Sequence, residues 1–280
     1  MVDSDSSPTS GAQAKTPGKD SISPAVWKQI KEKLNDIERE NTVRILLAVE
    51  SGSRAWGFPS PDSDYDVRFL YARPRDWYLS IGPRRDVIEC PIVDMLDING
   101  WDINKALGLL LKANPVLSEW LCSPIRYRED PACTKQLCAL AARVAFARPS
   151  HFHYLHLGRS AYAKISDRES VATKKYFYAI RPALALRWLR TRSGPPPMDL
   201  PRLRDGLHLE RELDEEIERL AVAKSESTEL GIGSRIGEID RFIEEEFALA
   251  DIASLSNGAG TPDLLEDTNR LFREIVDEGS

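Results

Sequence analysis

The sequence has no long apolar run and no apolar segment near its N-terminus. Hydrophobic residues make up 42% of the 280 positions, yet no uninterrupted stretch approaches the roughly 18 residues that a membrane-spanning helix needs. The N-terminal segment is polar and lacks the apolar core of a secretory signal. We therefore expect a cytoplasmic protein with no membrane partner.

Cysteine is scarce and unpatterned. The four cysteines form no Cys-x-x-Cys pair and are Cys90, Cys122, Cys133 and Cys138. Such scatter is typical of reduced thiols and disfavours a disulfide framework or a zinc site.

Histidine is equally scarce, but three of the four histidines lie together at His151, His153 and His156. Their i, i+2, i+5 spacing does not converge on one face of a helix, and zinc requires converging ligands. The cluster therefore does not predict a metal site, although contact with a substrate stays open.

Positive charge is not in excess. The formal net charge is −6, which argues against a general nucleic-acid coat because non-specific binding depends on neutralising phosphates. A local basic groove remains compatible with this charge. The acidic excess lies partly in the C-terminal third, in stretches whose spacing is typical of solvated helix faces.

The most informative segment is Gly52–Asp66, which reads GSRAWGFPSPDSDYD. Short apolar, β-branched runs flank it at residues 43–49 and 67–72, which predicts a strand, a Gly-Ser turn, a loop and a second strand. Side chains alternate along a strand, so Asp64 and Asp66 project from the same face. Neighbouring carboxylates repel each other, and a cation between them relieves the repulsion. Oxygen ligands suit Mg²⁺ or Mn²⁺.

Two simpler interpretations compete with a catalytic one. The aspartates are also compatible with turn capping after a Pro-rich loop, and a Gly-Ser pair alone is more often a turn than a phosphate loop. The combination of the pair with the Asp-x-Asp motif favours the chemical interpretation.

A Gly-Ser pair, a ten-residue spacer and Asp-x-Asp resemble the signature of the DNA-polymerase-β superfamily of nucleotidyltransferases. The longer strings ESGSRAWGFPSPDSDYDVRFLY and LDINGWDINKALGLLLKANPVLSEWL resemble one branch, the RNA-ligase-associated nucleotidyltransferases. The resemblance covers roughly residues 26 to 250. It implies an enzyme that transfers NMP from an NTP to an acceptor, with an RNA end as the expected acceptor. Transfer to a protein or a small molecule, and a non-catalytic nucleotide-binding regulatory module, are the alternatives.

The resemblance also assigns site residues. Asp64 and Asp66 are the expected metal ligands, Gly52 and Ser53 approach the triphosphate, and Arg54 adds positive charge to it. The superfamily usually needs a third carboxylate from a neighbouring strand.

Asp97 and Asp94 compete for the role of this third carboxylate as a further catalytic and metal-binding residue. They are three positions apart, so on a regular strand they face opposite sides and only one can serve. Asp97 is preferred because it lies in the LDINGWD string that resembles the family.

The predicted fold class is α+β, with a small mixed-sheet nucleotidyltransferase module followed by an all-helical module. We expect a disordered tail at residues 1–22, a catalytic domain at 23–129 and a helical substrate-binding domain at 130–280. Ser23 and Pro24 predict the start of a helix, and residues 87–98 predict a third strand. Residues 103–121 predict a helix broken near Pro115, and from Asp130 onward the pattern is helical only.

One helix of the second module carries a candidate acceptor-binding face. Lys174, Tyr178 and Arg181 fall on one side of it at i, i+4 and i+7, where cations and an aromatic ring suit an RNA backbone. A solvated surface is the equal alternative. A second face is expected to be core and comprises Phe177, Leu184 and Trp188.

Two further features are open. Trp56 and Trp101 either stack on a base or pack against the sheet. Asn99-Gly100 predicts a turn before the helix that begins near Asp102.

Overall fold

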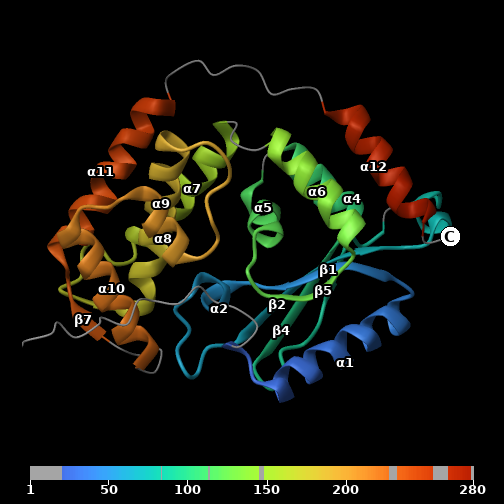
Figure 1. Ribbon diagram of the computed structural model, residues 1–280, viewed down its shortest axis with the longest axis horizontal. Coiled ribbons are helices and arrows are strands. Elements are labelled where there is room, and N and C mark those ends of the chain that lie inside the picture. The colour runs from blue at the N-terminus through green and yellow to red at the C-terminus, as the bar shows by residue number, and fades with distance from the viewer. Residues whose placement is uncertain are drawn as a thin grey trace, which may run out of the picture.

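A five-stranded mixed sheet forms the base of one half of the molecule (Figure 1). The computed structural model describes residues 21–82, 84–112, 114–144, 148–226, 232–254 and 264–278. The strand order is β3-β4-β2-β1-β5. The strands are β1 (Arg44–Glu50), β2 (Tyr65–Ala72), β3 (Val87–Glu89), β4 (Leu96–Asp102) and β5 (Arg126–Glu129). The α+β class predicted from the sequence is confirmed.

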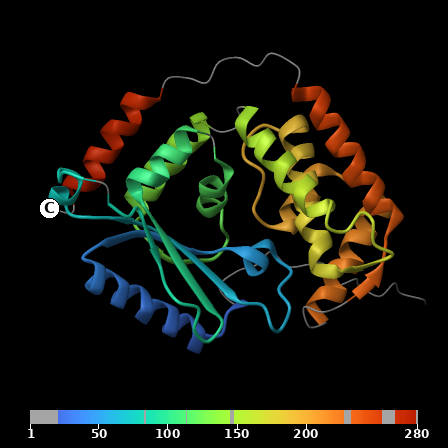
Figure 2. The ribbon, with the colours of Figure 1, turned by 180° about the vertical axis from the view of Figure 1, so that it is seen from behind.

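Strands β2 and β4 are parallel, whereas every other pair in this sheet is antiparallel. Parallel neighbours begin at the same edge of a sheet, so the first residues of β2 and β4 lie side by side. Figure 2 shows these strands from behind, between α1 (Pro24–Asn41) and the helices on the opposite face. This shared edge is where the sequence motif places its aspartates.

The segment predicted to hold one strand, residues 87–98, forms a hairpin instead. Strand β3 ends at Glu89, the chain turns through Asp94 and Met95, and β4 begins at Leu96. Both turn residues have positive φ, 51° and 64°, as the tight hairpin turn requires.

The turn predicted at Asn99-Gly100 is wrong, because both residues lie inside β4. A Cβ on Gly100 would lie 2.2 Å from Cε2 of Phe69 on the neighbouring strand. Glycine is present here because an aromatic ring fills the space of a side chain, not because the chain turns.

Helices cover both faces of this sheet. The N-cap of α1 is Ser23, as predicted, and its side chain accepts a hydrogen bond from the backbone N–H of Val26. Ile30, Leu34 and Ile37 of this helix are buried against one face. The other face is covered by α4 (Ile103–Leu111), α5 (Pro115–Leu121), α6 (Pro131–Val144) and α12 (Leu265–Asp277). The predicted break near Pro115 separates α4 from α5.

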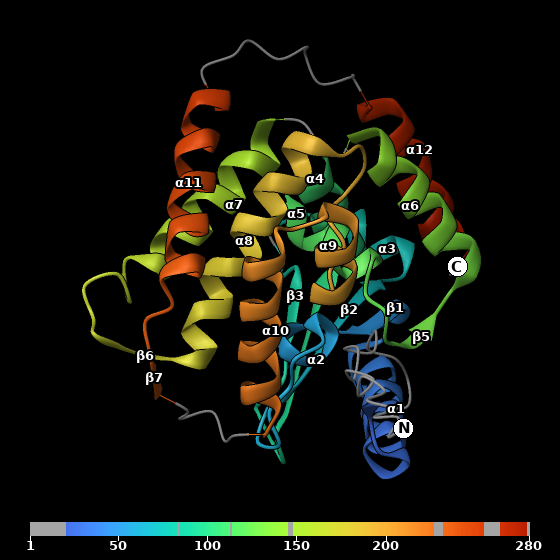
Figure 3. The ribbon, with the colours of Figure 1, turned by 60° about the vertical axis from the view of Figure 1, so that its left-hand side comes forward.

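Two of these helices lie elsewhere than expected. Helices α6 and α12 fall within residues 130–280, which the sequence assigns to the helical module. Their apolar side chains instead join the cluster formed by β1, β2 and α4. Figure 3 shows both on the side away from α11 (Gly237–Ser254). We call residues 21–144 with α12 the sheet module, and residues 148–254 the helical module.

The helical module packs its own core around α8 (Thr173–Thr191). Its other helices are α7 (Arg148–Tyr162), α9 (Leu200–Leu207), α10 (Arg211–Glu226) and α11. The prediction of helices only is wrong in one detail. A small antiparallel pair, β6 (Ser170–Ala172) and β7 (Ile232–Ser234), precedes α8 and α11.

Most of the segment predicted to be a disordered tail lies outside the described residues, although Ile22 is buried beside α1. Across the part of the chain that is described, no helix combines the length and apolarity needed to cross a bilayer.

Candidate active site

The Gly-Ser motif opens α2 (Gly52–Trp56), a short helix between β1 and the loop that leads to β2. Gly52 has φ of 58°, which favours glycine. A Cβ at this position would lie 2.0 Å from Oδ2 of Asp66, and the backbone N–H of Ser51 donates to the Asp66 carbonyl at 2.8 Å. The motif therefore needs glycine because its backbone lies directly against the Asp66 side chain.

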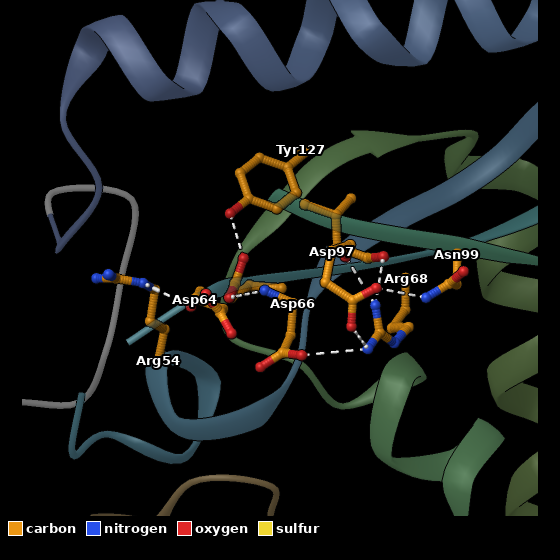
Figure 4. Close-up of polar contacts among 9 residues, drawn as sticks. Arg54, Asp64, Asp66, Arg68, Asp97, Asn99 and Tyr127 are labelled. Carbon is orange, nitrogen blue, oxygen red and sulfur yellow. Dashed lines mark hydrogen bonds and ion pairs between the residues drawn. The ribbon is translucent and has the colours of Figure 1, made fainter. Parts of the chain in front are cut away.

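The three predicted carboxylates gather at the edge where β2 and β4 begin (Figure 4). Asp66 and Asp97 are register partners on these parallel strands, and their side chains are 29% and 19% exposed. Asp64 is exposed and lies just before β2. Burial raises the pKa of Asp66, and the charges of Asp97 and Asp64 add to this effect. The alternative, Asp94, is exposed in the hairpin turn, so Asp97 is the residue beside Asp66.

An arginine that sequence reasoning missed lies between two of these carboxylates. Nη2 of Arg68 donates to Oδ1 of Asp66 at 3.1 Å and to Oδ2 of Asp97 at 2.7 Å. The remaining oxygen of Asp97 accepts a hydrogen bond from Asn99 at 2.6 Å. Arg68 follows Asp66 by two positions, so strand alternation alone could have placed both on one face.

The donor chemistry suits a hard divalent cation, because Asp66 and Asp97 are register partners at this edge and Asp64 lies just before β2. As they stand, however, no three Asp, Glu, His or Cys side chains within the described residues converge as a metal site. The Arg68 guanidinium instead lies between Asp66 and Asp97. The histidine cluster also holds no such site, and His151 contacts the Ala250 carbonyl through Nε2 at 2.9 Å.

A buried glutamate behind the site was also missed. Glu50 ends β1 and is fully buried. Its Oε1 accepts the backbone N–H of Asp66 at 2.9 Å, and its Oε2 accepts the hydroxyl of Tyr127 from β5. Burial raises the pKa of Glu50 to about 7. Glu50 thus fixes the backbone at Asp66 from the inner side of the sheet.

The raised pKa of Glu50 predicts a pH dependence of stability. The folded pKa of about 7 lies above the ordinary glutamate pKa of 4.5, so the folded state binds the proton more tightly than the unfolded chain. The stabilisation is complete below pH 4.5 and is lost as the pH rises through 7. The difference corresponds to on the order of 3 kcal/mol.

Glu50→Gln should therefore flatten this part of the pH profile, and the variant should gain stability relative to wild type between pH 5 and about pH 8. Urea unfolding across this range measures the difference. The exposed Glu245→Gln serves as the control. A parallel pair of profiles for wild type and Glu50→Gln would contradict the prediction.

Arg54, which the resemblance assigns to the triphosphate, is engaged within the protein. Its guanidinium is buried and donates to the carbonyls of Ser63 at 2.6 Å and Asp64 at 3.1 Å. It also stacks on the Tyr65 ring, 3.9 Å from the centroid. Arg54 therefore holds the loop that carries Asp64.

The helical module reaches the same loop. The buried Lys224 of α10 donates through Nζ to the Phe58 carbonyl at 2.8 Å. The Phe58 ring stacks on Phe177 of α8 with centroids 4.1 Å apart. The loop between the Gly-Ser pair and Asp64 is thus fixed by both modules.

The three residues of the predicted acceptor face on α8 do not share one environment. Lys174 is near enough to Asp66 for its charge to lower the pKa of that carboxyl against the larger effect of burial. Tyr178 is 41% exposed and meets Trp56 edge-on, with centroids 5.7 Å apart. Arg181, in contrast, is buried and pairs with Glu119 at 2.9 Å. The assignment of Arg181 to the acceptor face is wrong, because a sheet-module carboxylate neutralises it inside the protein.

Of the two roles open to Trp56 and Trp101, the structure favours packing inside the protein over stacking on a base. Trp101 lies 4.1 Å from Trp120, centroid to centroid, within the core above the sheet. Trp56 packs against the core of the helical module and the Arg181 guanidinium.

A known protein family matches most of the chain. The model of the RNA repair pathway DNA polymerase beta family matches residues 26–274. The chain belongs to this family. It is also 43% identical over 250 residues to the uncharacterized protein YcgL of Bacillus subtilis (strain 168), covering 89% of this chain and 96% of that protein.

Among solved structures, a nucleotidyltransferase-like protein from Exiguobacterium sibiricum 255-15 aligns over 89% of this chain and 88% of its own. The identity is 14% and the TM-score is 0.30, which is too low to establish a common fold. The family assignment therefore rests on the family match and on the relative from Bacillus subtilis.

Proposed function

We propose that this family member is a Mg²⁺- or Mn²⁺-dependent nucleotidyltransferase that transfers NMP from an NTP to an RNA end. The observation that carries the proposal is the approach of the Gly52 backbone to the Asp66 carboxylate, beside Asp97 on the parallel strand. The Gly-Ser turn, the proposed phosphate-binding element, and a pair of acidic residues thereby meet at one edge of the sheet. The RNA acceptor is supported by the description of the family.

The oxygen donors named above fit the metal. Asp64 and Asp66 would hold it, with Asp97 as the third carboxylate. When bound, divalent ions would neutralise charge on the triphosphate and on the attacking and leaving oxygens.

Residues of the chain would bind the phosphates and hold the aspartates in place. The backbone at Gly52 and the N–H and hydroxyl of Ser53 would bind phosphate oxygens, as in other phosphate-binding turns that contain glycine. Glu50 fixes the backbone of Asp66, and Arg54 fixes that of Asp64. The aspartates therefore sit on a frame that needs little rearrangement when substrate binds.

The acceptor is expected to approach between the modules. Lys174 near Asp66 and the exposed edge of Tyr178 are the residues of α8 that suit a phosphate backbone and a base. Lys175, the next residue, is also exposed.

Incubation with each labelled NTP, Mg²⁺ and either RNA oligonucleotides or cell protein tests the proposal. Label on the RNA end is the expected result, and it should be absent with Asp66→Ala. Label on protein would move the activity to a different acceptor, and no transfer to any acceptor would contradict the enzymatic assignment.

Charge reversal at Lys174 tests the acceptor side. Lys174→Glu should raise the KM for RNA and make the slope of log K against log salt shallower by about 0.7 to 1, because one phosphate contact is lost. NTP affinity should change far less. Binding of labelled RNA across a salt series measures the slope, with Lys28→Glu on α1 as the control. An unchanged slope would mean that Lys174 does not contact the acceptor.

A further inference from the structure

The position between Asp66 and Asp97 is filled by part of the protein. Four hydrogen bonds hold the Arg68 guanidinium there (Figure 4). Besides the two carboxylate contacts, Nη1 donates to the carbonyls of Val67 at 3.1 Å and Asp97 at 2.8 Å. The side chain is 19% exposed. A cation built into the chain therefore neutralises the carboxylates that the proposed reaction needs.

We propose that Arg68 is an exchangeable counter-ion: it leaves Asp66 and Asp97 when a divalent cation binds there, and it transfers its charge to the incoming triphosphate. The inference rests on the proposed function and adds to it a coupling between metal and nucleotide.

The carboxylate contacts show why Arg68 and a metal exclude each other. Both oxygens of Asp97 are engaged, one by Arg68 and the other by Asn99. Oδ1 of Asp66 is also engaged by Arg68, while its Oδ2 lies against Gly52. A divalent cation cannot contact both carboxylates directly while the guanidinium lies between them, because like charges at this distance repel.

The position of Arg68 on β2 indicates which group its guanidinium can contact after release. It lies on the same face of β2 as Asp66, so after release its flexible side chain stays near Asp66, whose carboxylate lies against Gly52. Phosphate is a favoured partner of a guanidinium, since it accepts two parallel hydrogen bonds. The triphosphate thus offers Arg68 a replacement for the carboxylates.

The two backbone carbonyls are the weaker part of the present arrangement. In the contacts of the guanidinium with carboxylates or phosphate both partners are charged, whereas in its contacts with backbone carbonyls only the donor is charged. Once a metal neutralises the carboxylates, the contacts to Val67 and Asp97 carbonyls compete poorly with a phosphate. Without nucleotide, however, release leaves Arg68 with only water as a partner. Metal alone should therefore bind wild type weakly.

Binding of Mn²⁺ to Arg68→Met tests the proposal. Protein-bound Mn²⁺ is measured by electron paramagnetic resonance, with and without a non-hydrolysable NTP analogue. Without the analogue, the variant should bind Mn²⁺ about tenfold more tightly than wild type, the factor expected for one lost charge-assisted hydrogen bond. With the analogue, it should bind no more tightly than wild type.

Arg204→Met is the matched control, because Arg204 also bridges two carboxylates, Asp214 and Glu218, but within the helical module. It should bind Mn²⁺ as wild type does in both conditions. Circular dichroism checks that the variants fold. If Arg68→Met does not fold, Arg68→Lys is measured in the same way, since an ammonium group cannot keep all four contacts. The same pattern is expected: tighter Mn²⁺ binding than wild type without the analogue, and no tighter binding with it.

Two results would overturn the inference. An equal gain in Mn²⁺ affinity with and without the analogue would make Arg68 a permanent neighbour whose charge only weakens the site. No gain in either condition would make it a fixed support. If wild type binds no Mn²⁺ even with the analogue, and Asp66→Ala behaves identically, the proposed function itself fails.

Discussion

Replacing Asp66 with alanine should reduce nucleotidyl transfer by on the order of a thousandfold or more, because several kcal/mol of charge stabilisation at the metal would be lost. The fold should survive. Burial raises the pKa of this carboxyl above its ordinary value, so its ionised form costs stability at neutral pH. Arg68 keeps its contact with Asp97 at 2.7 Å. We expect the Tm without metal to stay the same or rise.

Single-turnover transfer and thermal unfolding of the same preparation measure both effects. Asp76→Ala, an exposed position on α3 (Arg75–Tyr78) beyond the far end of β2, is the control for removing a carboxylate. Near wild-type turnover of Asp66→Ala in Mg²⁺ would falsify the assignment of Asp66 as a metal ligand.

Asp97→Asn should lower turnover by about a hundredfold or more, the range expected for loss of a positioned base or charged ligand. Asparagine keeps the size of the side chain and can still accept from Arg68, so NTP binding should persist. Transfer rates and NTP affinity are measured separately. The expected pattern is a loss in kcat with little change in nucleotide affinity.

Asp94→Asn provides a stringent control for this prediction. It makes the same chemical change three residues away, and asparagine tolerates the positive φ of 51° at that position. It should retain wild-type turnover. If Asp94→Asn were inactive and Asp97→Asn active, the third carboxylate would be Asp94 and the hairpin would have to rearrange in the working enzyme.

The sequence predicted the acidic edge well, because strand alternation is a local rule. The spacing of Asp64 and Asp66 and the preference for Asp97 needed only short segments and the family resemblance. The geometry agrees, since Asp66 and Asp97 are register partners. The catalytic roles of these residues remain predictions.

Residues whose partners lie far along the chain could not be placed in this way. Arg181 falls on the same helical face as Lys174 by spacing, but it pairs with Glu119, which is 62 positions away. Glu50 ends an apolar run, and its environment depends on Tyr127, which is 77 positions away. Helical or strand periodicity contains no information about such contacts, so burial and neutralisation of these charges appeared only in three dimensions.

The position of α12 has a consequence for the order in which the protein matures. Leu271 and Ile275 of this helix pack with α4 and α6 in the sheet module, and the Ile275 carbonyl accepts a hydrogen bond from Arg44 on β1 at 2.7 Å. The whole helical module is synthesised between these partners. On the ribosome, where N-terminal segments emerge first, the sheet that bears the aspartates must wait for residues 264–278 before its outer layer closes. A nascent chain that stalls within the helical module would expose the apolar surface that α12 covers.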